Sequence, residues 1–395
     1  MSNNKIKVLH ILGALLPSGA ETMLFSSAGY WNPDYEIHLL ATAKERGSYA
    51  SELERAGYIV HHIYNDNYFK HHNAVRRFIK KEEFDIVHVH KQAEACSYAW
   101  DAKLGGAKRI VRTVHNVFVF HGLVQIREKA TRHIACRLGV QHVAISPSVR
   151  ENEKRRFGIE TVEIRNWYDE NRFYFTTQEM RQEARTKLRI AEDAFCLLSV
   201  GNCTPVKNHM SILKALEENK DDSRFDSVIY LHVGHGMQED EEKDFVSGNG
   251  MEKHVRFFGF DDPAPYLQAA DLYVMPSTYE GFGISAVEAL ATGLPCIFTD
   301  VPGLEDFKEN HFDNLQFCEL NDDAIEEAIK NAVISGKKEN SMAQAQKVKQ
   351  LYGIEGGVKQ YEAVYNGRLP EIIGGGIEGY YPLTVSRWNP CLLSA

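Results

Sequence analysis

The chain has 395 residues, of which 44% are hydrophobic and 25% charged, and its formal net charge is −9. This length exceeds one typical domain and suits two, and the composition is that of a globular protein rather than a fibrous or disordered one. No apolar run approaches the roughly 20 residues that span a bilayer, and no secretory signal precedes the first predicted strand, so we expect a cytoplasmic protein.

The first half of the chain alternates short β-branched runs with amphipathic helical stretches. Strands are predicted there at 6–12, 35–41, 58–64, 85–90, 109–115 and 142–146, with helices between most of them. A second cycle predicts strands at 195–201, 228–234, 254–260, 271–276 and 295–299. Strand–helix–strand alternation implies two parallel sheets, each covered by helices on both faces.

This pattern predicts that the chain is divided into four parts. Residues 1–170 and 171–345 each form a doubly wound α/β domain, and ligands are expected in a cleft at the carboxyl ends of their strands. Residues 346–368 are a helical segment that is expected to pack back toward the first domain. Residues 369–395 form a tail of unknown role, in which three consecutive glycines suggest a flexible or peripheral extension.

Charge is distributed unevenly between the halves. Residues 1–170 carry a net charge of +5 and 12 of the 17 histidines, and the remaining residues carry −14. Two surfaces with different partners and ordinary solvated charge both agree with this asymmetry. The basic residues alternate with acidic ones instead of forming a continuous patch, so nucleic acid is not an expected partner.

The seven cysteines are scattered and contain no C-x-x-C pair. This spacing argues against a disulfide framework and against a cysteine-rich zinc site. Most of the cysteines are therefore expected to be small hydrophobic residues of the core.

The segment STYEGFGISAVEALATGLP (277–295) carries the clearest chemical signal. Gly281 and Gly283 lie in a loop between a predicted strand and a predicted helix. A glycine-rich turn of this kind presents backbone N–H groups to an anion. Glu280 and Glu288 flank this turn, and carboxylates accept hydrogen bonds from sugar hydroxyls. The combination suits a phosphate joined to sugars on both sides, as in a nucleotide sugar. The alternative is an ordinary strand–turn–helix with solvated glutamates.

The run E-G-F-G-I-S-A-V-E resembles the Glu, seven residues, Glu signature of retaining glycosyltransferases of the GT-B fold, particularly glycosyltransferase family 4 (group 1). The likeness covers everything before the tail. It implies an α/β fold of two Rossmann-like doubly wound domains that face each other across a cleft, with the acceptor on the first and the nucleotide sugar on the second. It also implies that Glu280 contacts the donor sugar, that Glu288 holds the ribose, and that amides around Phe282, Gly283 and Ile284 cradle the diphosphate.

LSVGNCTPVKNH (198–209) resembles the family segment that normally contains V-G-R followed by K-N. By this match Lys207 is the cation on the donor diphosphate. Asn202 stands in the donor-binding segment where the family often has Arg, so one positive charge near the leaving group is missing. Either Lys207 and backbone dipoles suffice, or another cation substitutes, or activity is impaired.

LGALLPSGAETML resembles the family's first loop, in which Gly13 and the pair Gly19–Ala20 approach the phosphates or the acceptor. The loop lacks G-x-G-x-x-G, so neither NAD nor FAD is expected. His115 ends a predicted strand and matches a family histidine near the donor sugar, although a lone histidine is more often structural. Asn166 matches the asparagine of a family turn in which Trp167 replaces the usual glycine.

The resemblance implies a retaining hexosyltransferase that moves a sugar from a nucleoside diphosphate sugar to a glycan or lipid-linked glycan in cell-surface polysaccharide synthesis. UDP is the expected nucleotide because it is the most frequent one in the family. Glu280, Lys207 and His115 are its expected catalytic residues; Gly19, Asn202, Phe282, Gly283, Ile284 and Glu288 are its expected donor contacts. No Asp-x-Asp motif occurs at these segments, so no metal and no cofactor are expected. A non-catalytic GT-B subunit, supported by Asn202, and a sugar-nucleotide epimerase remain as alternatives.

Two basic clusters, Arg150–Lys154–Arg155–Arg156 and Arg76–Arg77–Lys80–Lys81, agree with peripheral contact at the inner face of a membrane. Each basic residue near an anionic surface contributes about 1 kcal/mol of attraction. A solvated helix face explains the same residues.

Overall fold

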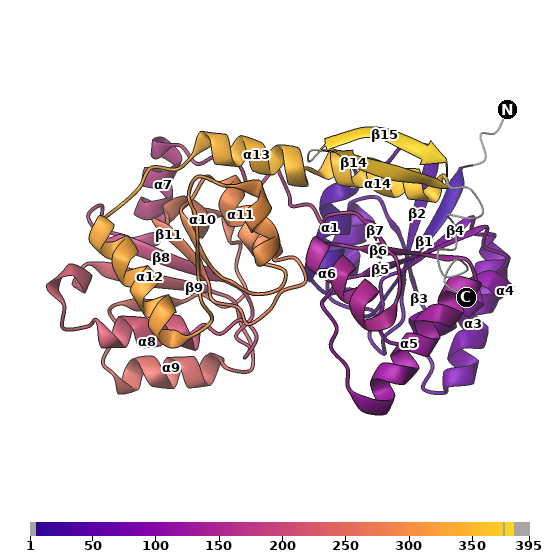
Figure 1. Cartoon of the computed structure of the whole chain (residues 1–395), viewed down its shortest axis with the longest axis horizontal. Coiled ribbons are helices and arrows are strands. Elements are labelled where there is room, and N and C mark those ends of the chain that lie inside the picture. Colours follow the sequence, from indigo (N-terminus) through magenta and orange to yellow (C-terminus); the bar gives the residue numbers. More distant parts are fainter. Residues whose placement is uncertain (1–4, 374–375, 383–395) are drawn as a thin grey trace. The chain divides into compact units, whose positions relative to one another are not determined.

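The computed structural model describes residues 5–373 and 376–382, with side chains described up to Arg368. The chain forms two compact units (Figure 1). Unit 1 comprises Met1–Trp167 and Tyr352–Ala395, and unit 2 comprises Tyr168–Leu351. None of the described helices is both long enough and apolar enough to cross a membrane.

Unit 1 is built on a parallel sheet of seven strands. These are β1 (Ile6–Leu12), β2 (Tyr35–Ala41), β3 (Ile59–His62), β4 (Ile86–Val89), β5 (Arg109–Val114), β6 (Val140–Ala144) and β7 (Val162–Glu163). Their order is β3-β2-β1-β4-β5-β6-β7, so the direction of strand addition reverses between β1 and β4. In open α/β sheets ligands bind outside the carboxyl ends of the strands at such a switch point.

Helices cover both faces of this sheet. They are α1 (Gly19–Ser27), α2 (Ala50–Arg55), α3 (Tyr68–Glu82), α4 (Ala95–Gly105), α5 (Gly122–Arg137), α6 (Pro147–Asn152), a π-helical turn η1 (Glu153–Phe157) and α14 (Ile354–Tyr365). Leu9 and Ile11 of β1 share a hydrophobic cluster with residues of α3, α4 and α5. His10, between them in the strand, contacts the rings of Trp31 and Tyr365 instead. The two sets of neighbours follow from the alternation of side chains along a strand.

Trp167 joins the two chain segments of unit 1. Its side chain is buried, and its indole Nε1 donates a hydrogen bond to the carbonyl oxygen of Met23 over 3.0 Å. The ring packs against α14 at Gly357, where a Cβ atom would lie only 2.3 Å from Cε3 of Trp167. A large residue at position 167 is thus accommodated by the absence of a side chain at position 357.

Unit 2 is built on a second parallel sheet. Its strands are β8 (Phe195–Val200), β9 (Val228–Val233), β10 (Val255–Phe257), β11 (Leu272–Met275), β12 (Cys296–Thr299) and β13 (Leu315–Cys318). The order is β10-β9-β8-β11-β12-β13, and the direction of strand addition reverses between β8 and β11. In both units the switch point therefore lies next to the first strand of the unit, β1 or β8.

The core of unit 2 contains alternate residues of the central strands and the apolar faces of the helices, among them Leu197, Leu213, Val274 and Ile329. The helical elements are α7 (Gln178–Leu188), α8 (Met210–Glu218), η2 (Ser223–Phe225), α9 (Glu239–Gly248), α10 (Ala264–Ala269), α11 (Ile284–Ala291), η3 (Glu305–Asn310), α12 (Asp322–Ser335) and α13 (Met342–Tyr352), η2 and η3 being 3₁₀ turns.

The expected α/β architecture of two doubly wound parallel sheets is confirmed. Two edge strands, β7 and β13, were not predicted. The helical segment predicted for residues 346–368 contains the end of α13 and the whole of α14, which are separated at Gly353. The start of the tail forms an antiparallel hairpin of β14 (Arg368–Ile373) and β15 (Gly376–Pro382), which the sequence pattern did not indicate. Residues 374–375 and 383–395, to which the expectation of a flexible extension also applied, lie outside the described residues.

Six of the seven cysteines lie in the described part of the chain, and all six are free. Cys136, Cys196, Cys203 and Cys296 are buried, as expected for small core residues. Cys391 lies outside the described residues.

The contact between Gly357 and Trp167 predicts a large difference between two neighbouring substitutions. Gly357→Ala is expected to destabilise unit 1 by roughly 1–3 kcal/mol, because the added methyl group overpacks a rigid indole. Gly356→Ala, where a Cβ meets no atom within 4 Å, should instead stabilise α14 by up to about 1 kcal/mol. Trp31, Trp100 and Trp167 lie in the described part of unit 1 and unit 2 contains no tryptophan, so urea unfolding followed by tryptophan fluorescence reports on unit 1. Equal effects of the two substitutions would contradict the packing described here.

Candidate functional site

The loop between β11 and α11 has the predicted strand–turn–helix form. Gly283 lies directly before α11 with a φ of 79°, a left-handed conformation that favours glycine. Phe282 turns inward and packs near the ring of Phe307, which anchors the loop to η3. Within the described residues, the backbone N–H groups of Gly283 and Ile284 donate to no protein acceptor. The start of α11 therefore presents free donors and the positive end of a helix dipole to an anion.

Lys207 and Glu280 meet beside this helix terminus. Lys207 Nζ lies 2.7 Å from Glu280 Oε1, and the same oxygen accepts a hydrogen bond from Ser277 Oγ over 2.7 Å. Both ionic side chains are mostly buried, which strengthens their attraction relative to an exposed pair. The structure thus brings together the cation predicted from the loop after β8 and the carboxylate predicted from the loop after β11.

Hydrogen bonds to main-chain carbonyl groups fix the two loops relative to each other. Thr278 N donates to the Val206 carbonyl oxygen over 2.7 Å, and Asn208 Nδ2 donates to the Pro276 carbonyl oxygen over 3.1 Å. Behind Glu280, the segment after β12 comes so close that a Cβ on Gly303 would lie 2.2 Å from the Glu280 carbonyl oxygen. Lys207 and Glu280 are therefore held by main-chain structure and not only by their mutual attraction.

Glu288 lies in the second turn of α11. Its side chain is half-buried, and desolvation raises the pKa of its carboxyl group to about 8, an effect that Arg172 opposes and that Asp169 and Asp262 reinforce. The carboxyl group is therefore substantially protonated at neutral pH in the absence of a ligand. It can donate a hydrogen bond in that form and accept hydrogen bonds from hydroxyl groups when ionised.

Asn202 is exposed at the start of the loop that carries Lys207. The family often has an arginine at this position, and its positive charge is absent here. No second cation pairs with Glu280 in its place, because Lys207 is the only cation that forms an ion pair with Glu280 among the described residues. The seven residues predicted in unit 2 thus lie on two adjacent loops and the helix that follows one of them.

Gly19 and His115 belong to unit 1. Gly19 is exposed and begins α1, whereas His115 follows β5 and takes part in a chain of histidines. His115 Nε2 lies 2.9 Å from His90 Nδ1, and His90 Nε2 lies 2.9 Å from His10 Nδ1. The sequence analysis did not single out His10, which lies within the predicted strand 6–12, or His90, which ends the predicted strand 85–90; both look like ordinary polar residues of buried strands.

Burial keeps these three imidazoles neutral. Desolvation lowers the pKa of His115 to about 4 and that of His10 to about 3, and it lowers the pKa of His90 well below its usual value. Neutral rings that each donate one hydrogen bond and accept another can form a continuous chain. The chain borders a small cavity of about 20 Å³ that Ala20 of α1 also lines.

A larger cavity of about 370 Å³ lies beyond the carboxyl end of β4 in unit 1. Most of its walls come from the segment after β4, the start of α4 and α5, and they include Gln92, Glu94 and Glu128, with Arg112 of β5. Arg112 is buried between Glu153 and Gln92, and its guanidinium Nη2 donates to Gln92 Oε1 over 2.6 Å. The cavity therefore offers both donors and acceptors of hydrogen bonds.

Comparison with known proteins agrees with the chemistry of both units. Residues 17–172 match the family described as Glycosyltransferase Family 4, and residues 180–349 match Glycosyl transferases group 1. A UDP-Gal:alpha-D-GlcNAc-diphosphoundecaprenol alpha-1,3-galactosyltransferase of Escherichia coli is 24% identical over 81% of this chain and 86% of its own length. An N-acetyl-alpha-D-glucosaminyl L-malate synthase of Bacillus anthracis is 28% identical over 72% of this chain and 75% of its own length.

Solved structures show the same fold. Anabaena HepE in complex with UDP aligns with a TM-score of 0.75 at 20% identity, over 91% of this chain and 99% of its own. A glycosyltransferase of Rickettsia africae aligns with the same TM-score at 19% identity, over 92% and 98% of the two chains. The fold is GT-B, and the chain belongs to the group 1 glycosyltransferases of family 4.

Proposed function

We propose that this glycosyltransferase moves a sugar from a UDP-sugar to a glycan or lipid-linked glycan of a cell-surface polysaccharide, with retention at the anomeric carbon. The observation that carries the proposal is the ion pair of Lys207 and Glu280 beside the free N–H groups at the start of α11. A cation, helix-terminal donors and a sugar-binding carboxylate suit a sugar diphosphate. The E. coli relative is named for a UDP-Gal donor and a diphosphoundecaprenol-linked acceptor, and HepE binds UDP.

We assign the roles of these residues from the family resemblance together with their positions. Lys207 exchanges part of its contact with Glu280 for the donor diphosphate, and the amides of Gly283 and Ile284 bind the same group. Glu280 then accepts hydrogen bonds from hydroxyls of the transferred sugar, and Glu288 holds the ribose. Negative charge grows on the leaving diphosphate during transfer, so Lys207 and the helix dipole stabilise the transition state without a divalent cation.

Unit 1 supplies the acceptor side of the reaction in this proposal. The cavity of about 370 Å³ falls within the size range of small-molecule sites, and its polar walls suit the hydroxyl groups of a sugar. His115 contacts the donor sugar as a neutral ring, because its pKa is lowered to about 4. Gly19, at the exposed start of α1, provides close backbone approach to the phosphates or the acceptor.

Removal of either ionic partner tests the proposed function. Lys207→Ala and Glu280→Gln are each expected to lower transfer by at least about 100-fold, the scale seen when one charge-stabilising donor is lost. The measurement is UDP release from UDP-sugars by the purified chain in the presence of lipid-linked acceptor. Lys214→Ala is the matched control, because Lys214 forms a 2.7 Å ion pair with Asp322 in the same unit but on an exposed surface.

Full activity in either site variant would refute this assignment. Sugar transfer by the purified wild-type chain would exclude the non-catalytic subunit that Asn202 suggests. Conversion of the UDP-sugar to its epimer without an acceptor would favour the epimerase instead.

The raised pKa of Glu288 predicts how the stability of the ligand-free protein depends on pH. The folded state holds the carboxyl proton more tightly than the unfolded state does, so this contribution to stability is complete below about pH 4.3 and is lost as the pH rises toward 8. Each unit of pKa difference corresponds to about 1.4 kcal/mol. The stability of wild type relative to Glu288→Gln should therefore fall between these pH values, as measured by urea unfolding. A difference that stays constant across this window would contradict the assignment.

Peripheral membrane contact is a further part of the proposal, and it concerns the start of α5. Val119, Leu123 and Ile126 are exposed there, with Leu123 83% accessible. Gln125 Nε2 donates to the Arg156 carbonyl oxygen over 3.0 Å, which holds this apolar patch beside the basic turn that includes Lys154 and Arg155. Exposed apolar side chains next to basic ones suit an anionic membrane surface.

Vesicle flotation tests this surface. The double variant Leu123→Glu/Ile126→Glu should lose most of its binding to vesicles that contain anionic lipid, because it removes apolar contact and adds negative charge. Met237→Glu, which replaces an equally exposed apolar residue of unit 2, should bind like wild type. Wild-type protein that does not float with anionic vesicles would remove the membrane contact from the proposal.

A further inference from the structure

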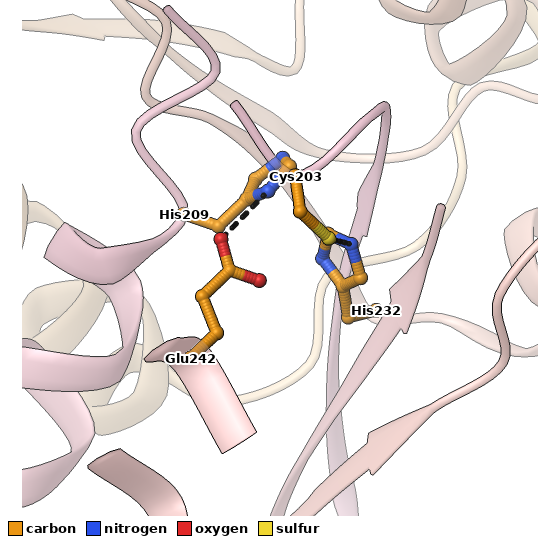
Figure 2. Close-up of side chains that lie close together, drawn as sticks. All are labelled: Cys203, His209, His232 and Glu242. Atoms are coloured by element: carbon orange, nitrogen blue, oxygen red, sulfur yellow. Dashed lines mark hydrogen bonds and ion pairs between the residues drawn. The ribbon is translucent and has the colours of Figure 1, made fainter. Parts of the chain in front are cut away.

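Unit 2 contains a second cluster of chemically active side chains, separate from the pair of Lys207 and Glu280. Cys203 lies in the loop after β8, His209 immediately precedes α8, His232 lies in β9, and Glu242 lies in α9 (Figure 2). All four side chains are buried, and one potential ligand atom from each lies within 4.8 Å of all the others. The four elements thus direct a sulfur, two ring nitrogens and a carboxylate oxygen toward one point.

The separations between these ligand atoms suit a tetrahedral metal ion. Cys203 Sγ lies 3.2 Å from His232 Nε2, and His209 Nδ1 lies 3.5 Å from Glu242 Oε1. Zinc bonds to sulfur at about 2.3 Å and to nitrogen or oxygen at about 2.0–2.2 Å, which places neighbouring tetrahedral ligands about 3.3–3.6 Å apart. The remaining pairs of ligand atoms lie within 4.8 Å of one another.

Several polar atoms of the cluster have partners only inside the cluster. Within the described residues, His209 Nδ1 and both carboxylate oxygens of Glu242 are buried; His209 Nδ1 faces Glu242 Oε1 over 3.5 Å, and the Cys203 thiol hydrogen-bonds to the Glu242 carboxylate. His209 is 3% and Glu242 1% exposed, and no lysine or arginine in the described ranges forms an ion pair with Glu242. A buried carboxylate that no lysine or arginine neutralises is costly. A cation at the centre of the cluster satisfies these atoms together.

The surroundings hold the potential ligands in place. His232 Nδ1 lies 3.2 Å from both Ser199 Oγ and Tyr230 OH, so a proton on Nδ1 can be donated to a hydroxyl while Nε2 faces Cys203. Such contacts on the far nitrogen orient histidine ligands in metal sites. The Cys203 backbone is held against the segment after β9, where Gln238 N donates to the Cys203 carbonyl oxygen over 3.0 Å.

We propose that Cys203, His209, His232 and Glu242 bind one Zn²⁺ ion in a closed, four-coordinate structural site. The mixed sulfur, nitrogen and oxygen donors suit zinc, whereas magnesium and calcium prefer oxygen donors alone. A buried site with four protein ligands leaves no position for a substrate, so the ion has a structural role. Because Cys203 lies four residues before Lys207, the ion braces the loop that presents Lys207. The metal site itself does not depend on the proposed sugar transfer.

Metal analysis of the full chain tests this site directly. Protein produced with zinc in the medium and purified without chelator should contain one zinc ion per chain, as measured by inductively coupled plasma mass spectrometry. The Co²⁺-substituted protein should show a thiolate-to-cobalt charge-transfer band. Cys203→Ser should lose this band, and Cys318→Ser, a half-buried cysteine of the same unit outside the cluster, should keep it.

Thermal unfolding gives an independent measurement. Removal of metal by a chelator should lower the Tm of wild type and Cys318→Ser, and Zn²⁺ should restore it, because a ligand that binds only the folded state stabilises it. Wild-type protein that neither contains zinc nor binds added Zn²⁺ or Co²⁺ would overturn the proposal, as would an unchanged thiolate band in Cys203→Ser. The measurements on wild type decide the question even if Cys203→Ser does not fold.

Discussion

The parallel pairing of β8 with β11 is the constraint on which the candidate site in unit 2 depends. Leu197 and Leu198 of β8 are opposite Leu272 and Tyr273 of β11, so both strands end at the same edge of the sheet. The loops that follow them are therefore neighbours, although more than 70 residues of chain separate Lys207 from Glu280. Strand addition reverses at this pair, which is where α/β sheets bind ligands. Hydrogen bonds between the loops then bring Lys207 to the start of α11.

The same topology gathers polar residues in unit 1. β1, β4 and β5 are consecutive in the sheet, and they bring His10, His90 and His115 into one hydrogen-bonded chain. In unit 2 the neighbouring pair of β8 and β9 brings Cys203 close to His232. Polar side chains next to the central strands are expensive to bury, so the histidine chain at the switch point of unit 1 and the cluster beside the β8–β9 pair of unit 2 both agree with functional or metal-binding roles.

The sequence predicts what is local and misses what depends on strand order. Glu280, Gly283 and Glu288 fall within one short segment, so a glycine-rich turn and one helix suffice to place them. Lys207 could be joined to them only through the family resemblance, because its distance from Glu280 depends on the pairing of β8 and β11. The strands β7 and β13 escaped prediction because they are short edge strands with little alternation.

The remaining differences have related causes. His10 and His90 belong to segments that otherwise look like ordinary buried strands, and only the order of β1, β4 and β5 makes them neighbours. The cluster of Cys203, His209, His232 and Glu242 lacks the close cysteine spacing by which zinc sites are usually recognised, since its members come from four elements. The packing of Trp167 against Gly357 likewise could not be predicted from the sequence, because the two residues belong to segments that precede and follow unit 2 along the chain.

The central claim is that unit 2 binds a nucleoside diphosphate sugar through Lys207 and the start of α11. The most direct measurement is thermal unfolding of wild type and Lys207→Ala with UDP-, GDP- and ADP-sugars, because bound ligand raises the Tm in proportion to its occupancy. The account predicts that a UDP-sugar raises the Tm of wild type in a concentration-dependent way and raises that of Lys207→Ala much less. A wild-type Tm that none of the three sugars changes, or an equal increase in both proteins, would contradict it.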